Sequence, residues 1–242
     1  MAISTIEYRF LAEAHRVARL PQGGRVLELG EANTNRINTY ALDTAAAIEE
    51  LLPQGNSCDA LVAQARQSQI STTIESRYAE AKMLYKALFN YSSYAAVDLL
   101  PPADYRLQRD LNQPFDLGER YEVVINNGTS EHVFNQANCY KVIHDHTKVE
   151  GVMIHWTPCI GWVNHGLFHV QPGFFFDLAA SNDYEMALAC LAGYDSLYEL
   201  KPGMPEGVTN ALACVVLRKL KDQPFRFPLQ GKYAELKKYA AA

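Results

Sequence analysis

The sequence lacks paired cysteines, although it contains five: Cys58, Cys139, Cys159, Cys190 and Cys214. No two of them are separated by only two residues, and their number is odd. Neither a zinc ribbon nor a disulfide framework is therefore indicated. Dispersed thiols of this kind are typical of the reducing cytoplasm, where disulfides are rare.

The sequence also lacks long apolar runs and an excess of positive charge. No run approaches the roughly 18 apolar residues of a membrane span, and the N-terminal segment has no apolar stretch typical of a signal peptide. The net charge of −5 and the isoelectric point near 5.8 give no electrostatic reason to expect a nucleic-acid or membrane partner. We expect a cytoplasmic protein that acts on a small-molecule substrate, with a homodimer as one option for its oligomeric state.

Hydrophobic periodicity divides most of the chain into alternating strands and helices. Short apolar runs predict strands at residues 25–29, 94–99, 105–109, 121–126 and 150–156. Apolar residues at three- and four-residue spacing predict helices at residues 4–20, 38–52, 57–69, 73–89 and 129–144. This alternation indicates a mostly parallel sheet with helices on both faces.

The last third of the sequence predicts a different arrangement. A helix is expected at residues 177–192, followed by strands at 194–200 and 211–219 with a turn-rich segment between them. Two consecutive strands with no helix between them favour an antiparallel hairpin on one edge of the sheet. The segment after residue 223 is irregular, with a terminal helix as an option.

Four consecutive predicted strands end in polar residues or glycine: Glu28 and Gly30, Asp98, Asp110, and Asn126 with Asn127. In an open α/β sheet the ligand lies outside the carboxyl ends of the strands, near the point where the strand order reverses. A carboxylate at such a place accepts two hydrogen bonds from ribose hydroxyls. We therefore expect a ribose-containing cofactor at this edge.

The order of these motifs resembles the class I S-adenosylmethionine (SAM)-dependent methyltransferases. The resemblance covers roughly residues 20–220 and rests on five segments: Val-Leu-Glu-Leu-Gly at 26–30, Ala-Val-Asp at 96–98, Arg-Asp-Leu at 109–111, Tyr-Glu-Val-Val-Ile-Asn at 121–126 and Ser-Glu-His-Val at 130–133. It implies SAM as the cofactor and a final antiparallel strand. The expected fold is α/β: a Rossmann-like, seven-stranded, mostly parallel sheet with an antiparallel edge strand, helices on both faces and an extra helical cap.

The expected cofactor-binding residues are Glu28, Gly30, Glu31, Asp98, Asp110, Leu111 and Asn126. By matching position, Glu28 and Gly30 contact the amino-acid portion of SAM. Asp98 matches the acid that binds the ribose. Asp110 and Leu111 match the segment that binds the adenine.

Two features depart from the family pattern. The family usually carries two or three glycines in the first loop, whereas residues 30–35 read Gly-Glu-Ala-Asn-Thr-Asn. Side chains such as Glu31 or Asn33 would then hold the methionine end of SAM, or SAM would adopt an altered pose. Residues 36–90 are long enough for three helices where the family has one. We expect one SAM-binding domain over residues 1–242, with these extra helices as an insertion that caps the substrate pocket.

A nicotinamide-dependent dehydrogenase is the alternative enzyme class that such a sheet allows. Its loop requires Gly-x-Gly-x-x-Gly with an acid about 20 residues later. Two of those glycines are missing here, and the acid that ends the second strand is much too far away. The loop therefore argues against this class of enzyme.

Asn127, His132 and His155 are the candidate catalytic residues. A neutral imidazole can remove a proton from an attacking hydroxyl or amine, and both histidines lie on segments expected to converge near Asn127. The alternative for His132 is that it only caps or packs its helix. A metal site built from His155, His165 and His169 is a further option, but no acidic residue lies among them. No metal ligand is predicted.

Three functions fit these features. The first is transfer of the SAM methyl group to an oxygen or nitrogen of a small metabolite, with the aromatic-rich segment 156–176 excluding water. The second keeps SAM as the substrate, as in an azetidine-2-carboxylate synthase that cyclises the aminobutyrate arm and releases methylthioadenosine. The third is a non-catalytic SAM-fold binding subunit. The sequence favours the first, a methyltransferase.

Overall fold

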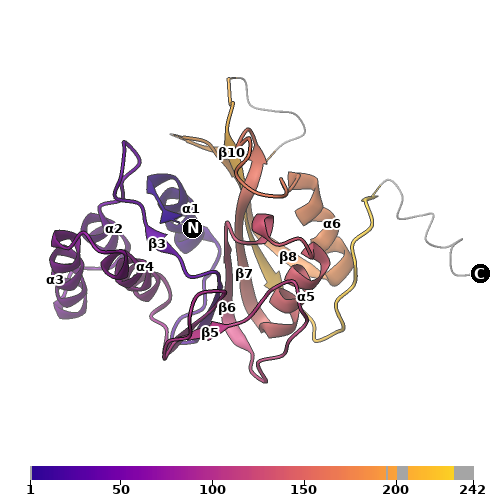
Figure 1. Ribbon diagram of the computed structural model, residues 1–242, viewed down its shortest axis with the longest axis horizontal. Helices are drawn as coiled ribbons and strands as arrows, with labels where there is room; N and C mark the ends of the chain where they lie inside the picture. The colour runs from indigo at the N-terminus through magenta and orange to yellow at the C-terminus, as the bar shows by residue number, and fades with distance from the viewer. Residues whose placement is uncertain (1, 195, 201–206, 232–242) are drawn as a thin grey trace, which may run out of the picture.

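An eight-stranded mixed sheet forms the centre of the computed structural model, which describes residues 2–194, 196–200 and 207–231 (Figure 1). Across the sheet the strands follow the order β5 (Arg106–Gln108), β4 (Ser93–Asp98), β2 (Arg25–Leu29), β6 (Tyr121–Asn127), β7 (Thr147–Ile160), β10 (Ala211–Lys219), β8 (Tyr184–Ala192) and β9 (Leu197–Glu199). The first five of these strands are parallel. β10 is antiparallel to both of its neighbours, and β9 is antiparallel to β8.

Helices cover both faces of this sheet, which Figure 1 shows nearly edge-on. Alternate residues along each strand point to opposite faces, so Val123 and Ile125 join one core and Val124 the other. On the first face lie α1 (Thr5–Val17) and α4 (Ile74–Phe89). On the second lie α5 (Gln136–His146) and α6 (Pro172–Asn182).

The extra helices of the first face pack on one another. α2 (Thr44–Leu51) and α3 (Asn56–Ile70) bury a small apolar core against α4. A two-stranded parallel pair, β1 (Ala2–Ile3) with β3 (Asn33–Thr34), joins the N-terminus to the loop after β2. Within the described part of the chain, no helix is both long and apolar enough to cross a bilayer.

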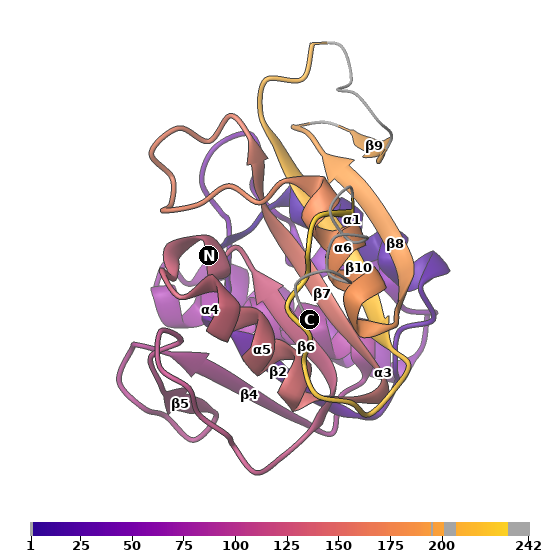
Figure 2. The same ribbon diagram turned by 90° about the vertical axis from the view of Figure 1, so that its right-hand side faces the viewer.

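The predicted fold class is confirmed, and several elements lie where the sequence predicts them. β2 and β10 begin and end at the expected residues. Ser4 caps α1 in a capping box with Glu7, as the Ser-Thr-Ile-Glu sequence indicates. The sheet contains one strand more than expected, because β8 forms where a helix was predicted. The short β9 falls within the predicted strand 194–200 and lies beside β8 (Figure 2). The segment predicted as one helix at 129–144 is a 3-10 turn, η1 (Ser130–His132), followed by α5.

The prediction of a single helix at residues 177–192 is wrong. Asp183 adopts a left-handed conformation (φ 54°) that ends α6, and β8 follows at once. The sequence Ala-Leu-Ala-Cys-Leu-Ala within β8 has high helix propensity, but pairing with β10 overrides it. Tertiary burial decides the structure of this segment.

The predicted edge hairpin between residues 194–200 and 211–219 does not form. All nine residues of β10 are buried, and a strand buried on both faces is most stable inside a sheet, with a neighbour on each side. β10 therefore inserts between β7 and β8, and β9 forms the edge instead. The terminal-helix option falls on residues 232–242, outside the described part of the chain.

A buried glutamate fixes the glycine-poor loop after β2. Glu80 of α4 accepts hydrogen bonds from the hydroxyls of Thr34 (2.7 Å) and Thr44 (3.1 Å) and forms an ion pair with Arg36. Arg77 donates to the backbone oxygen of Thr34 at 2.8 Å. Because a buried carboxylate is costly unless it is paired, these contacts hold the loop against α4.

We expect Glu80→Gln to lower the free energy of unfolding by about 2 kcal/mol, because Arg36 loses its charged partner in a largely buried place. Urea denaturation measures the change. Glu75→Gln is the matched control, because Glu75 is exposed on the same helix. Equal stabilities of the two variants would contradict this role of Glu80.

Candidate active site

A cavity of about 340 Å³ opens at the carboxyl ends of the central parallel strands. It lies where the strand order reverses, since the chain proceeds from β2 to β4 and β5 on one side and continues with β6 and β7 on the other. Such a switch point is the usual ligand site of an open α/β sheet. Five of the predicted residues line this cavity: Gly30, Asp98, Asp110, Leu111 and His132.

Gly30 allows the loops after β2 and β6 to approach each other closely. Its φ of +71° favours glycine, and a Cβ built there would lie 2.3 Å from Oγ1 of Thr129. The Gly30 N–H donates to the backbone oxygen of Val97 at 2.7 Å. Gly30 thus joins three strand ends at the floor of the cavity.

Asp98 and Asp110 present carboxylates to the cavity. Asp98 accepts from the backbone N–H groups of Glu31 (2.8 Å) and Leu100 (2.9 Å). Asp110 accepts from the backbone and side-chain nitrogens of Asn112, both through Oδ1. A carboxylate offers about four acceptor positions, so both side chains retain capacity for a ligand.

Glu28 lies behind the cavity instead of lining it. Its buried carboxylate accepts from the hydroxyls of Tyr85 (2.6 Å) and Tyr94 and from the backbone N–H of Ala32 (3.1 Å). Burial raises the pKa of Glu28. Its contacts position the loop after β2, so the structure gives it a supporting place.

Glu31 also points away from the cavity lining. Its buried carboxylate pairs with Lys82 at 2.6 Å and with Arg106 at 2.8 Å. These ion pairs tie the first loop to α4 and to β5. Because its carboxylate already pairs with both cationic side chains, Glu31 fixes the position of the loop. Its backbone N–H also donates a hydrogen bond to Asp98.

Asn126 and His155 form a buried pair beneath the turn after β6. Asn126 donates to Oγ of Ser130 (2.9 Å) and accepts from the Ser130 N–H (3.0 Å), which fixes the turn. Its Nδ2 also lies 3.2 Å from Nδ1 of His155. His155 packs against the rings of Tyr140 and Phe175. Neither Asn126 nor His155 lines the cavity, so the structure does not bring them to the other predicted residues.

Burial lowers the pKa of His155 to about 3. The folded protein then takes up this proton near pH 3, whereas the unfolded chain takes it up near the ordinary histidine pKa of 6.5. The unfolded state binds more protons between these values, so stability decreases as the pH falls through 6.5, by about 1.4 kcal/mol per pH unit from this group. We expect the His155 ring resonances in NMR to stay unchanged from pH 8 to pH 5. A titration with a midpoint near 6.5 would contradict this.

Buried polar atoms without hydrogen-bond partners gather near the carboxyl ends of β6 and β7. Within the described residues they include Oδ1 of Asn127, Nε1 of Trp156, Oγ1 of Thr157 and Nε1 of Trp162. Buried polar atoms are almost always paired in folded proteins. Asn127, one of the predicted catalytic residues, does not line the cavity.

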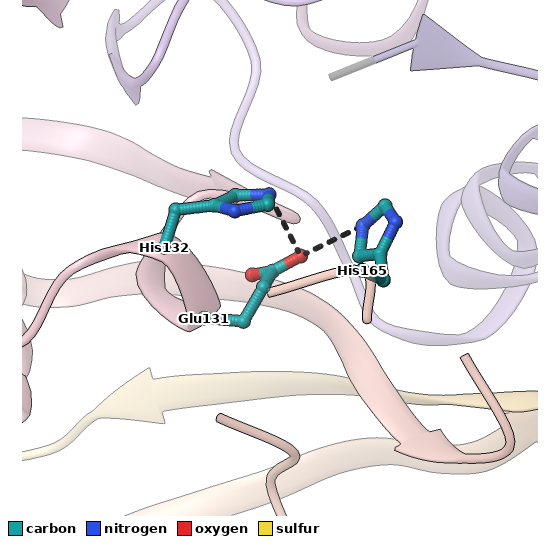
Figure 3. A group of neighbouring side chains, drawn as sticks. All are labelled: Glu131, His132 and His165. Atoms are coloured by element: carbon teal, nitrogen blue, oxygen red, sulfur yellow. Dashed lines mark ion pairs between the residues drawn. The ribbon is translucent and has the colours of Figure 1, made fainter. Parts of the chain in front are cut away.

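A cluster missed by the sequence reasoning consists of Glu131, His132 and His165 (Figure 3). Oε1 of Glu131 lies 4.0 Å from Nε2 of His132 and 3.7 Å from Nε2 of His165. Burial raises the pKa of Glu131 to about 7 and lowers the pKa of both histidines. His132 and His165 line the cavity.

The histidine option considered from the sequence does not form. His155 is buried in the core, and exposed His169 makes its contact with the backbone oxygen of Trp162 at 3.2 Å. Only His165 of that set joins the cluster, with partners from the turn after β6. The Ser-Glu-His-Val segment was a signal for Glu131, because it follows a strand that ends at the cavity.

Comparisons with known proteins find similar folds at low sequence identity. The 1,6-didemethyltoxoflavin-N1-methyltransferase of Burkholderia thailandensis is 10% identical (TM-score 0.47; 88% of this chain and 78% of that chain covered). TehB of Haemophilus influenzae is 12% identical (0.46; 86% and 61%). The O-methyltransferase of a trans-AT polyketide synthase from Brevibacillus brevis is 11% identical (0.40; 88% and 71%). No known family model and no curated protein matches the sequence.

The topology itself defines the class of fold. A parallel sheet with its switch point between β2 and β6, helices on both faces and a reversed final strand is the arrangement that the class I resemblance implies. The chain therefore has the Rossmann-like α/β fold that this resemblance implies.

Gly30→Ala tests the close approach of the two loops. Left-handed strain costs about 1 kcal/mol, and overpacking against Thr129 adds about 1–3 kcal/mol. We expect Gly23→Ala, the control, to show the strain alone, since its φ is +76° with no atom within 4 Å. Adding Thr129→Ala to Gly30→Ala should restore part of the loss in urea denaturation. Equal costs at both glycines would contradict the steric argument.

Proposed function

We propose that this protein is a SAM-dependent methyltransferase that acts on an oxygen or nitrogen of a small metabolite. The observation that carries the proposal is the composition of one cavity. From the end of β5 to the loop after β7 it presents Asp110 and Leu111, then Asp98, Gly30, and finally His132 with His165. A volume of about 340 Å³ falls within the usual range of small-molecule sites, about 300–1,000 Å³.

The residues present fit SAM. Asp98 is placed to accept from ribose hydroxyls, the recognition used at this strand end in nucleotide-binding sheets. Apolar Leu111 and Val97 line the cavity beside Asp110, which suits a flat base with a polar edge.

If bound here, SAM would be held by Asp98, Asp110 and Gly30 and would supply an electrophilic methyl group to the acceptor. The chain's contribution is mainly proximity and orientation, which supply much of the rate for an activated group. The glycine-poor first loop is held by Glu28, Glu31 and Glu80. This fixed loop gives the cofactor end of the cavity a preorganised shape. His132 and His165 form the opposite wall, where the acceptor would lie.

Cofactor binding is tested by calorimetric titration with SAM and S-adenosylhomocysteine. We expect Asp98→Asn to weaken binding at least about tenfold, or about 1.4 kcal/mol, because the charged acceptor is lost. Asp104→Asn is the matched control on an exposed loop residue outside the cavity. If the wild-type protein binds neither SAM nor S-adenosylhomocysteine, both SAM-dependent reactions are ruled out. The non-catalytic binding subunit is then the remaining function of the three.

The reaction is tested by mass spectrometry of the nucleoside product. Incubation with SAM and a pooled small-metabolite fraction should yield S-adenosylhomocysteine, at a rate that depends on the added fraction. Methylthioadenosine formed from SAM alone would instead establish cyclisation and overturn methyl transfer.

A further inference from the structure

The buried carboxylate of Glu131 lacks hydrogen bonds. Its side chain is fully buried, and neither oxygen has a hydrogen-bond partner among the described residues. The nearest ring nitrogens, on His165 and His132, lie 3.7 and 4.0 Å from Oε1, too far for a hydrogen bond. Because an unpaired buried carboxylate is costly, the gap between these three side chains is where a positive charge belongs.

We propose that Glu131, His132 and His165 bind one divalent transition-metal cation of the zinc class. The three ligand atoms lie within 4.8 Å of one another. Two imidazoles and a glutamate are the protein ligands of His₂Glu catalytic zinc sites, which keep a fourth position open. Bonds of about 2.0–2.2 Å place tetrahedral ligand atoms about 3.3 Å apart. Small side-chain rotations close the remaining difference.

The kind of ligand selects the kind of cation. Ca²⁺ and Mg²⁺ are bound mainly by oxygen atoms, whereas imidazole suits zinc and its neighbours in the transition series. Two of the three ligands here are imidazole nitrogens. The site therefore favours Zn²⁺ over the hard cations, although the sequence alone predicted no metal ligand.

Backbone contacts hold the ligands in place. The backbone oxygen of Glu131 accepts from the N–H groups of Leu167 (2.8 Å) and Phe168 (3.1 Å). A Cβ at Gly166 would lie 3.0 Å from this same oxygen, so the loop packs directly on residue 131. These contacts dock the segment that carries His165 onto the turn that carries Glu131 and His132. Two distant parts of the sequence thus form one rigid set of ligands.

A cation held by these side chains would border the cavity, since His132 and His165 line it. Its role there rests on the proposed function. At the acceptor end, a divalent cation would hold an acceptor oxygen and stabilise its deprotonated form as a Lewis acid. The acceptor class is then a metabolite with a hydroxyl group that coordinates a metal.

The site is tested with Zn²⁺ on the full-length protein after treatment with a chelator. We expect one equivalent of Zn²⁺ per chain by elemental analysis, and visible d–d absorption when Co²⁺ replaces it. His165→Ala and Glu131→Gln should each weaken Zn²⁺ binding at least about tenfold in calorimetric titration, since even outer-shell changes cost 10- to 100-fold.

His169→Ala is the matched control, because His169 is exposed on the same loop and lies outside the cluster. It should bind Zn²⁺ as the wild type does. Circular dichroism on each variant establishes that it is folded. No uptake of Zn²⁺ by the wild type, or equal affinities of the folded His165→Ala and His169→Ala variants, would overturn the proposal.

Separate readouts distinguish this proposal from the proposed function. Asp98→Asn should lose SAM affinity and retain Zn²⁺, whereas His165→Ala should lose Zn²⁺ and retain SAM affinity. Zn²⁺ binding without any SAM binding would preserve the metal site and refute the methyltransferase. SAM binding without Zn²⁺ binding would preserve the proposed function and refute the metal site.

Discussion

The close approach of the loops after β2 and β6 is the constraint on which the site depends. Thr129 occupies the space that a Cβ on residue 30 would need. This contact sets the position of the first loop against the turn that carries Glu131 and His132. The adjoining strands β2 and β6 are hydrogen-bonded in register, which supports the contact from below. The two loops therefore meet at the cavity in a fixed relation to each other.

The buried glutamates near this contact between the two loops have different roles. Glu28 is satisfied by two tyrosine hydroxyls and an N–H, Glu31 by two cations, and Glu80 by two threonines and an arginine. Each pays for its burial with contacts that fix the glycine-poor loop. Glu131 has no such contacts within the described residues. By the same physical reasoning, the three paired carboxylates are structural and the unpaired one is available to a ligand.

Local signals in the sequence predicted much of the fold, because they act over a few residues. The capping box at Ser4 and the apolar run of β2 are of this kind, and both were correct. The prediction for residues 184–192 was wrong because their alanines and leucines favour a helix locally, whereas pairing with β10 makes them a strand. That pairing joins segments separated by a long loop and leaves no local mark.

The candidate site shows the same division between local and distant information. Gly30, Asp98, Asp110, Leu111 and His132 reach the cavity because each lies at the carboxyl end of a strand or in the loop that follows it, a position that the sequence pattern reveals. His155 also lies on such a strand, but its side chain points to the face covered by α5 and α6. A shift of one residue along a strand reverses the face, and the sequence did not show which face each residue takes.

Contacts with the surrounding structure hold the loop after β7 in a strained backbone conformation. Trp162 and Asn164 both have positive φ, at 54° and 64°, and such conformations cost free energy in residues other than glycine. Asn210 accepts from the Trp162 N–H at 3.0 Å, and the backbone of Glu131 accepts twice from the far end of the loop. Contacts at both ends thus offset the strain between them. His165, which lies between these anchors, is presented to Glu131 by a backbone that the adjoining structure determines.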